Sequence, residues 1–470
     1  MLVRLIIALI SFLPISLMAQ WGRSEYLTQT HFKHTKLLPT ASISFLGSDK
    51  LIVNQTLGIF KKQKWSEKVS TRVYVGSEFF NGGLLPQNQI KTSQGKEFSP
   101  YLGRVYTEGD WRIAPILRMH TEYEIHPSFF IYAGYDSRRY GNWFDSAWRD
   151  KSSAPTPYLG YDYNISQHLN YNFQIDYANN DGILGDASKG KYLATHSLNI
   201  KIKQLQLNFF ESVVWRRKNE NGYRGLEPIY LTPAMIFRPA EFSQGSSDNV
   251  LLGTGFEYKL YRTIKRKTDP QQGTVHKINF LTFYGQLTID EFLYKEVVAR
   301  NGWWANKHAA SIGVIFHSDI KNKYLFTTAI SYAHTRPYTY THSDSLQSYS
   351  NGAYSLAHFL GSNYRSLTTS IYLKSAKWGI RSMLNFYRSG EDALKNNGTD
   401  IILSNNSRSL EYGNAIGQNS DRINHYIHNR ILYYLDTKNT FFLEHQSHDK
   451  QHAFGFGYTY SLNSARRNNF

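Results

Sequence analysis

Residues 170–177 read Asn-Tyr-Asn-Phe-Gln-Ile-Asp-Tyr, and polar and apolar side chains alternate along the stretch without a break. A period of two places successive side chains on opposite faces of one β-strand. One face of this strand is therefore aromatic and aliphatic, and the other carries amides and a carboxylate. Such a strand separates an apolar environment from a wet one.

The same alternation recurs along much of the chain. It is found in residues 71–79, 128–137, 198–203, 205–209, 256–260, 378–387 and 454–462. Turn residues separate these stretches, as in Asn179-Asn180-Asp181-Gly182 and Asp436-Thr437-Lys438-Asn439. The sequence therefore predicts an all-β protein made of many short strands.

A soluble β-sandwich also alternates, but two observations count against it. Aromatic residues make up 15% of the chain, whereas the inner faces of a sandwich are mostly aliphatic. Charged and amide side chains occupy the opposite face deep inside the strands, as a water-filled lumen allows. In lipid every backbone group must be paired, so spanning strands close into a barrel. At about 9–11 residues per crossing, we expect a transmembrane antiparallel β-barrel of roughly 16–18 strands.

This interpretation assigns individual side chains to the two faces of the barrel. We expect the following residues to face lipid: Tyr171, Phe173, Ile175, Phe256, Tyr258, Phe454, Phe456 and Tyr458. We expect the following residues to face the lumen: Asn172, Gln174, Glu257 and Lys259.

The first nineteen residues have the pattern of a signal peptide. Arg4 precedes an apolar run over residues 5–13, Pro14 ends the run, and small residues lead to a cleavage site after Ala19. An N-terminal membrane anchor is the alternative, but the run is short for a spanning helix. We predict a single barrel domain over residues 20–470 in the bacterial outer membrane, with no strand assigned in residues 20–50.

Charge and cysteine content limit the partners. The formal net charge is +17, which favours anionic partners such as lipopolysaccharide and acidic surface polysaccharide. The basic residues are scattered and form no nucleic-acid motif, so we expect no nucleic-acid partner. The chain has no Cys, which excludes disulfides and thiolate metal sites, and we expect no cofactor.

Four long polar segments interrupt the strands. They are residues 215–249, 290–307, 336–364 and 389–421. Barrels of this type have short periplasmic turns and long extracellular loops. We expect all four segments outside the membrane or folded into the barrel, where they obstruct its mouth. Residues 290–300 have the spacing of a short helix.

Catalytic and metal-binding interpretations of these segments are weaker. Residues 342–345, His-Ser-Asp-Ser, hold the residue types of a hydrolase, but a triad is defined by its geometry in space. His445, His448 and His452 lie around a turn sequence, Asp449-Lys450, that does not favour a metal site. We therefore expect neither an enzyme nor a metal site; the catalytic alternative is a lipid hydrolase built into the barrel rim.

Polysaccharide binding is better supported, because sugars stack on aromatic rings and take Arg, Asn and acidic partners. The candidate residues come from three loops: Arg238 and Glu241; Trp303, Trp304, Asn306 and Lys307; Arg336, Tyr338, Tyr340, His342 and Tyr349. If residues 336–342 are extended, Arg336 and the three rings at positions 338, 340 and 342 share one face. The alternative is that these side chains pack the loops together, with Arg336 paired to Glu241 or Asp290.

Several blocks of the chain resemble the capsule-assembly Wzi family, and most closely the Bacteroidetes branch that includes the gliding-motility protein RemB. The blocks are residues 191–198, 210–215, 230–233, 237–243, 245–249, 284–286 with 290–292, 302–307, 336–342, 356–358, 360–361, 400–401 and 412–414. They occur in the family order and span about residues 191–423. The chain departs from the family pattern at Phe359, where Pro is usual, and at Arg365 and Ser366, where an acidic residue is usual.

The resemblance implies an outer-membrane barrel of about eighteen strands with an obstructed mouth. It also implies a role in attaching capsular or exopolysaccharide, in capsule assembly or in surface adhesion during gliding, without catalysis. A porin or transporter for small solutes or oligosaccharides is the alternative function.

Overall fold

The computed structural model describes residues 36–47, 51–80, 106–108, 111–138, 140, 145–150, 153–181, 185–220, 222–233, 248–266, 275–320, 323–352, 354–392, 395–436, 439–449 and 451–461. The predicted signal peptide and the candidate residues Arg238 and Glu241 lie outside these ranges. For some strand residues, Tyr458 among them, only the backbone is described.

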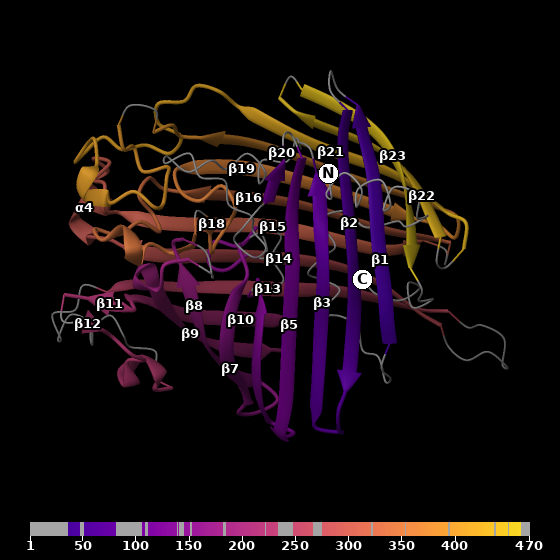
Figure 1. Ribbon diagram of the computed structural model, residues 1–470, viewed down its shortest axis with the longest axis horizontal. Helices are drawn as coiled ribbons and strands as arrows, with labels where there is room; N and C mark the ends of the chain where they lie inside the picture. Colours follow the sequence, from indigo (N-terminus) through magenta and orange to yellow (C-terminus); the bar gives the residue numbers. More distant parts are fainter. Residues whose placement is uncertain are drawn as a thin grey trace.

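Long β-strands dominate the described chain (Figure 1). In chain order they are β1 (Lys36–Gly47), β2 (Leu51–Lys64), β3 (Val69–Phe80), β5 (Trp111–His126), β6 (Phe129–Asp136), β7 (Thr156–Asn164), β8 (Leu169–Asn179), β9 (Gly190–Ile202), β10 (Leu205–Arg216), β13 (Asn249–Arg266), β14 (Val275–Glu291), β15 (Lys307–Ile320), β16 (Tyr324–Thr335), β19 (Tyr364–Lys374), β20 (Trp378–Ser389), β21 (Asn424–Tyr434), β22 (Asn439–His448) and β23 (Gln451–Ser461).

Within the described ranges these strands form one closed antiparallel sheet. The sheet has 19 strands. One of them, the three-residue β4 (Tyr106–Glu108), pairs with β5 alone. Each of the others pairs with two neighbours in the ring, and β5 pairs with β4 as well. β1 pairs with β23 to close the ring, with Thr40 opposite Ser461. The predicted antiparallel barrel is confirmed. The strand β1 lies within residues 20–50, where the sequence analysis predicts no strand.

The connections differ between the two ends of the barrel. At one end they are short turns, such as residues 127–128, 165–168, 203–204 and 375–377. At the other end the chain makes long excursions over residues 137–155, 217–248, 292–306, 336–363 and 390–423. The last four match the four predicted loops. We assign the long-loop end, which we call the mouth, to the cell exterior and the short-turn end to the periplasm.

The smaller elements lie in the long excursions, except β4 and η3, which lies in the shorter connection between β8 and β9. They are η3 (Ala187–Lys189), β11 (Lys218–Asn219), β12 (Gly222–Tyr223), η4 (Pro228–Leu231), α4 (Tyr294–Ala299), η5 (Ser345–Gln347), β17 (Ser350–Asn351), β18 (Tyr354–Ser355) and η6 (Asn405–Ser407). The helix α4 falls within the predicted helical stretch 290–300. Among the described residues, no helix has the length and apolar character needed to cross a membrane.

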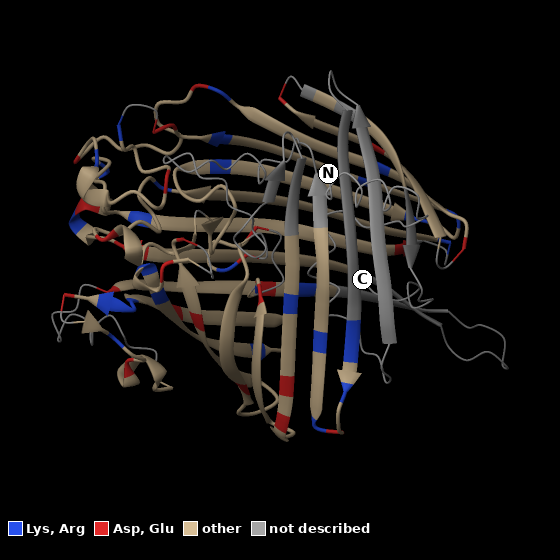
Figure 2. Ribbon diagram, in the orientation of Figure 1, with Lys and Arg blue, Asp and Glu red and all other residues tan. Residues whose placement is uncertain are grey.

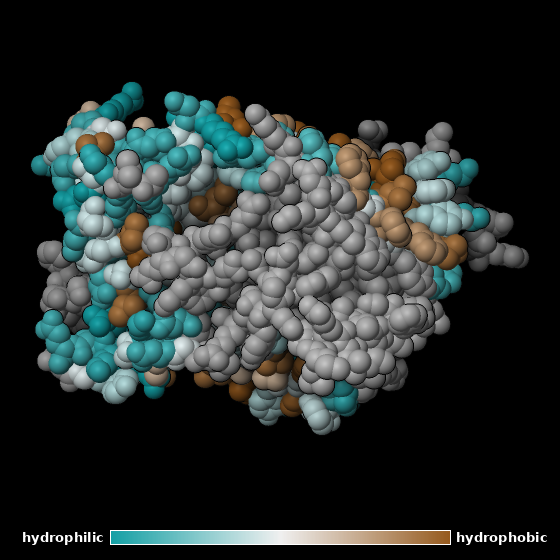
Figure 3. All heavy atoms as spheres, turned by 45° about the horizontal axis from the view of Figure 1, so that its top comes forward, coloured by the Kyte–Doolittle hydropathy of each residue, from teal (hydrophilic) through white to brown (hydrophobic). Residues whose placement is uncertain are grey.

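The two faces of the barrel wall follow the predicted alternation. Phe256, Tyr258, Phe454 and Phe456 are exposed on the outer face, as predicted. On the inner face Asn172, Gln174 and Glu257 are buried, and Lys259 forms an ion pair with Glu257. Figure 2 shows that Lys, Arg, Asp and Glu lie mostly in the loops and toward the strand ends. On the face drawn in Figure 3, hydrophobic side chains gather along the barrel wall and hydrophilic ones over the loops at its left-hand end.

Part of the lipid-facing prediction is wrong. Tyr171, Phe173 and Ile175 lie on the outer face of β8, but they are buried in a cluster with Trp215 and Tyr230. Tyr230 comes from η4, in the long excursion between β10 and β13, and Ile229 and Leu231 pack against the same cluster. This excursion folds back over the outer wall, so protein covers these side chains.

Candidate functional site

A short inward-folded stretch occupies the lumen near the mouth. We call it the plug segment, residues 145–150. The Trp148 ring stacks on Phe210 of β10, with ring centroids 3.8 Å apart, and its Nε1 donates to the Ser212 hydroxyl at 2.8 Å. Arg149 donates to both carboxylate oxygens of Asp176 in β8, at 3.2 and 2.9 Å. Aromatic stacking and a buried ion pair therefore hold the plug segment against the inner wall.

The loop that follows β16 packs onto the plug segment. The Tyr340 hydroxyl donates to the Ala147 carbonyl at 2.5 Å, and the Asp150 amide donates to the Leu356 carbonyl at 3.0 Å. His358 Nε2 lies 3.2 Å from a carboxylate oxygen of Asp145. The buried apolar side chains form one cluster: Ala147, Trp148, Leu193, Phe210, Val214, Leu251, Ala309, Tyr340, Tyr349, Leu356, Ala357 and Ile401. The predicted obstruction of the mouth is confirmed.

The expected extended arrangement of residues 336–342 is wrong. The Thr339 amide donates to the Arg336 carbonyl, and the Thr341 amide donates to the Tyr338 carbonyl. Tyr338 and Tyr340 have positive φ angles of 65° and 73°. Two successive turns therefore replace the strand-like backbone that a shared face requires.

Several predicted binding residues are buried and have structural partners. Tyr338, Tyr340 and Tyr349 are all fully buried. The Tyr338 hydroxyl donates to the Asn396 carbonyl at 2.8 Å, and Tyr340 and Tyr349 stack at 5.8 Å. The rings of these three tyrosines have no exposed face, and they pack the loops together.

Asn306, Lys307 and His342 also serve the loop structure. Lys307 is buried and pairs with Glu291 at 2.9 Å and, more distantly, with Asp290 at 3.8 Å. The side-chain Oδ1 of Asn306 accepts from the Leu293 amide at the start of α4. Burial lowers the pKa of His342, and the nearby charge of Lys307 lowers it further.

Among the described residues, Arg336 forms no ion pair with Asp290, one of the two acidic partners considered from the sequence; the other, Glu241, lies outside the described ranges. Its Nη2 donates to the Trp303 carbonyl at 3.2 Å and is 3.5 Å from the Asn414 carbonyl. Its Nε has no hydrogen-bond partner among the described residues. Asp290 instead accepts from the Tyr340 amide. The Arg336 guanidinium is thus half-buried, bonded to neutral carbonyls, and next to Trp303.

A cluster at the surface of the mouth includes three of the predicted residues. The Nε1 atoms of Trp303 and Trp304 both donate to Glu411 Oε1 at 3.0 Å. Arg408 donates to Glu411 Oε2 through Nε at 2.8 Å, and its guanidinium lies 4.4 Å from the Trp304 ring centre. We call Trp303, Trp304, Arg336, Arg408 and Glu411 the rim cluster.

The rim cluster combines planar rings with two guanidinium groups. Desolvation alone raises the pKa of Glu411, but hydrogen bonds from Arg408 and the two indoles outweigh it and lower that pKa on balance. Glu411 therefore stays ionised and fixes the orientation of both indoles. One face of Trp304 is occupied by Arg408, whereas Trp303 is half-exposed and packs edge-on against Trp304.

Sequence reasoning missed Arg408, Glu411 and the whole plug segment. Tyr412-Gly413-Asn414 was recognised as a block of a family pattern, and Glu411 immediately precedes it. The plug segment carries an aromatic residue, Trp148, and three charged residues, Asp145, Arg149 and Asp150, between two predicted strands. That composition was the available signal.

No protein-family description and no curated protein matches this sequence. Among solved structures, the chain is similar to one described as Wzi, an outer-membrane protein involved in group 1 capsule assembly in Escherichia coli and a carbohydrate-binding β-barrel. The identity is 11% and the TM-score 0.54, over 94% of this chain and 86% of that one. Two Pseudomonas aeruginosa outer-membrane proteins also match. OprD has 10% identity and a TM-score of 0.44, over 91% of this chain and 93% of that one. The protein opdK has 8% identity and a TM-score of 0.44, over 92% of this chain and 99% of that one.

Together with the closed antiparallel sheet and its apolar outer face, the likeness to the Wzi barrel shows that this chain has the fold of an outer-membrane β-barrel.

Proposed function

We propose that this protein holds an acidic polysaccharide at the cell surface through the rim cluster, and that it is a binding protein rather than an enzyme. The observation that carries the proposal is the arrangement of Trp303 beside two guanidinium groups. Arg336 is bonded to the Trp303 carbonyl, and Arg408 is held through Glu411, the same carboxylate that orients the Trp303 indole. A carboxylate of a sugar suits a guanidinium, and the apolar face of a sugar ring suits an indole.

The obstructed mouth supports binding over conduction. In an open porin, polar side chains line a water-filled channel. Here Trp148 and Phe210 stack inside the lumen, and Tyr340 and Leu356 pack beside them in a buried apolar cluster. The resemblance of the sequence blocks to the Wzi family, and the fold shared with a barrel described as carbohydrate-binding, also support a polysaccharide ligand.

This role suits capsule attachment and surface adhesion alike, because both require an outer-membrane anchor for a sugar polymer. The RemB-like branch, suggested by the same sequence blocks, favours adhesion during gliding. The proposal itself needs only the anchoring.

The test is polysaccharide binding by the purified protein and its rim variants. Trp303→Ala and Arg336→Ala should each lower affinity for an acidic polysaccharide such as polygalacturonate by roughly tenfold or more, since a charge-assisted hydrogen bond contributes about 1.5–3 kcal/mol. Trp65→Ala is the matched control, because Trp65 is an exposed indole in the β2–β3 turn at the periplasmic end.

Single-channel conductance of the same proteins separates the two functions. A binding protein keeps low conductance in wild type and in all three variants. Unchanged binding in Trp303→Ala and Arg336→Ala, with high conductance in wild type, would overturn the proposal in favour of a channel.

A further inference from the structure

A polar cavity opens into the lumen on the periplasmic side of the plug segment. We call it the lumen pocket; its volume is about 470 Å³, within the usual range of small-molecule sites, roughly 300–1,000 Å³. Its entrance is formed by exposed residues of two periplasmic turns and strand ends, including Ser166, His168 and Lys201. Its inner wall is formed by buried Asn172, Ser197 and Asn208. The pocket therefore faces the periplasm, opposite to the rim cluster.

Four asparagines from adjacent strands form a chain of side-chain hydrogen bonds along the pocket wall. Asn208 of β10 donates to Asn199 of β9 at 2.9 Å, and Asn199 donates to Asn170 of β8 at 3.2 Å. Asn170 then donates to Asn164 of β7 at 3.0 Å. Each amide is held by its neighbours, so the wall presents donors and acceptors in fixed positions.

Several polar atoms of the pocket have no hydrogen-bond partner among the described residues. They are Arg138 Nη1, Asn172 Oδ1, Ser197 Oγ and Asn208 Oδ1. Asn172, Ser197 and Asn208 are each more than nine-tenths buried. Buried polar atoms in proteins almost always have a partner, so these atoms point to a ligand or water that both donates and accepts hydrogen bonds.

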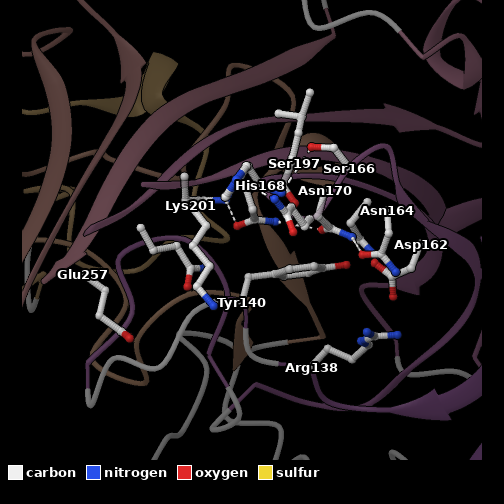
Figure 4. Close-up of a pocket in the computed structure, with 16 residues that line it drawn as sticks. Arg138, Tyr140, Asp162, Asn164, Ser166, His168, Asn170, Ser197, Lys201 and Glu257 are labelled. Atoms are coloured by element: carbon white, nitrogen blue, oxygen red, sulfur yellow. Dashed lines mark hydrogen bonds between the residues drawn. The ribbon is translucent and has the colours of Figure 1, made fainter. Parts of the chain in front are cut away.

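The inner end of the pocket is aromatic. The Tyr140 ring lines the cavity and stacks on Trp148 of the plug segment, with ring centroids 4.6 Å apart. Its hydroxyl donates to Gln174 at 2.9 Å, which fixes the ring. In the view of Figure 4, this ring lies between Arg138 and the amides around Asn170. An aromatic ring beside fixed amides is suited to the apolar face and the hydroxyl edge of a sugar.

The charges of the pocket exclude strongly charged ligands. Arg138 and Lys201 line it together with Asp162 and Glu257, so the formal charges of these side chains balance. An anion without hydroxyls would leave the two asparagine oxygens without donors, and a cation without hydroxyls would leave Arg138 Nη1 without an acceptor. An apolar molecule would satisfy none of the four atoms. A neutral molecule with neighbouring hydroxyls satisfies all of them.

We propose that the lumen pocket is a second carbohydrate site, which takes an uncharged, hydroxyl-rich oligosaccharide from the periplasmic side. The class of ligand in this proposal rests on the proposed function, whereas the geometry of the lumen pocket is independent of the rim cluster. Two sources share this chemistry: a surface polysaccharide in transit through the periplasm, and the N-acetylated glycan of the cell wall.

The binding test uses the full-length protein in detergent and calorimetric titration with three probes. Maltopentaose and chitotriose are uncharged, and trigalacturonate is acidic. We expect an uncharged probe to bind and trigalacturonate not to bind in the pocket. Tighter binding of chitotriose, used as its N-acetylated form, identifies the cell-wall glycan as the ligand. Tighter binding of maltopentaose identifies the surface polysaccharide in transit.

Variants locate the binding. Asn208→Leu and Asn172→Leu should each weaken binding of the uncharged probe at least tenfold. Asn385→Leu is the matched control: Asn385 is a buried lumen-facing asparagine with an unpartnered Oδ1 among the described residues, but it lies on β20, away from the pocket. Circular dichroism shows which variants retain the barrel. If a folded Asn208→Leu binds as wild type does, or if wild type binds no uncharged probe, the pocket is occupied by water only and the proposal is wrong.

A labelling test checks the side of entry and separates this proposal from the first. The native chain has no Cys, so Lys201→Cys places a single thiol at the pocket entrance. A maleimide too large to cross the outer membrane should leave it unmodified in intact cells and modify it once that membrane is permeabilised, and the bound probe should slow that modification. Labelling in intact cells would overturn periplasmic entry. Trp303→Ala should leave binding of the uncharged probe in the lumen pocket unchanged. A result that contradicts polysaccharide binding at the rim cluster can therefore be distinguished from one that contradicts binding in the lumen pocket.

Discussion

Arg149 and Asp176 form a two-point ion pair inside the barrel, and both side chains are 0% exposed. Removing one partner leaves an uncompensated buried charge, which destabilises by about 3–5 kcal/mol. We therefore expect Arg149→Ala to release the plug segment while the barrel wall persists. Single-channel conductance should rise, and the segment should become sensitive to added protease.

The control for this variant is an exposed ion pair. Arg422 pairs with Asp449 at 2.8 Å, and the Arg422 side chain is 62% exposed. Pairs of this kind contribute about 0–1 kcal/mol, so Arg422→Ala should change neither conductance nor protease sensitivity. Equal behaviour of the two variants would show that the ion pair does not hold the plug segment.

The covered patch on the outer wall predicts a local difference in lipid contact. Phe173 is 7% exposed beneath η4, whereas Leu159, on the same outer face of neighbouring β7, is 57% exposed. In a chain without native Cys, a lipid-soluble thiol reagent should modify Leu159→Cys quickly and Phe173→Cys slowly. Adding Tyr230→Ala to the Phe173→Cys variant should speed modification of the Cys at position 173. Rapid modification of Phe173→Cys on its own would mean that the excursion does not cover the wall.

His342 predicts a pH dependence of loop docking. Burial lowers its pKa from the ordinary 6.5, so below that pH an undocked loop binds more protons than a docked one. The contribution of the neutral ring to docking is complete above pH 6.5 and is lost as the pH falls toward the folded pKa. The protection factors of residues 336–349, which correct hydrogen exchange for its intrinsic pH dependence, should therefore fall on acidification, and His342→Asn should remove most of that fall. His126→Asn, at an exposed periplasmic position, should leave it intact.

Glu411 links two loops at the rim. The Trp304 amide donates to its backbone carbonyl, and both indoles donate to its side chain. Glu411→Ala should raise hydrogen exchange across residues 292–306 and lower affinity for acidic polysaccharide, because Trp303 and Arg408 lose their common anchor. Loss of affinity without faster exchange would mean that Glu411 contacts the ligand itself.

The sequence was sufficient for the wall of the barrel because alternation is a local signal. Phe256 and Glu257 are adjacent, and their opposite environments follow from the geometry of any strand. The same rule misplaced Tyr171 and Phe173, because the residues that cover them lie more than fifty positions further along the chain. A local pattern defines a face, but it does not show what lies against that face.

The interior of the mouth was beyond sequence reasoning for a similar reason. Ser146 and Gln286 hydrogen-bond across 140 positions of sequence. The prediction for Arg336 and its neighbouring rings failed more locally, because it assumed extended backbone where Tyr338 and Tyr340 adopt positive φ angles. Non-glycine residues rarely do so, and the composition of the loop carried no sign of it.

The pairing of β1 with β23 also has a consequence for biosynthesis. The ring is joined between the first and the last of the described strands, so the sheet cannot close until the segment from β1 to β23 has been delivered to the membrane. A chain interrupted anywhere before β23 keeps two unpaired strand edges, and such edges promote aggregation. This seam therefore makes closure of the sheet depend on both ends of the barrel sequence at once.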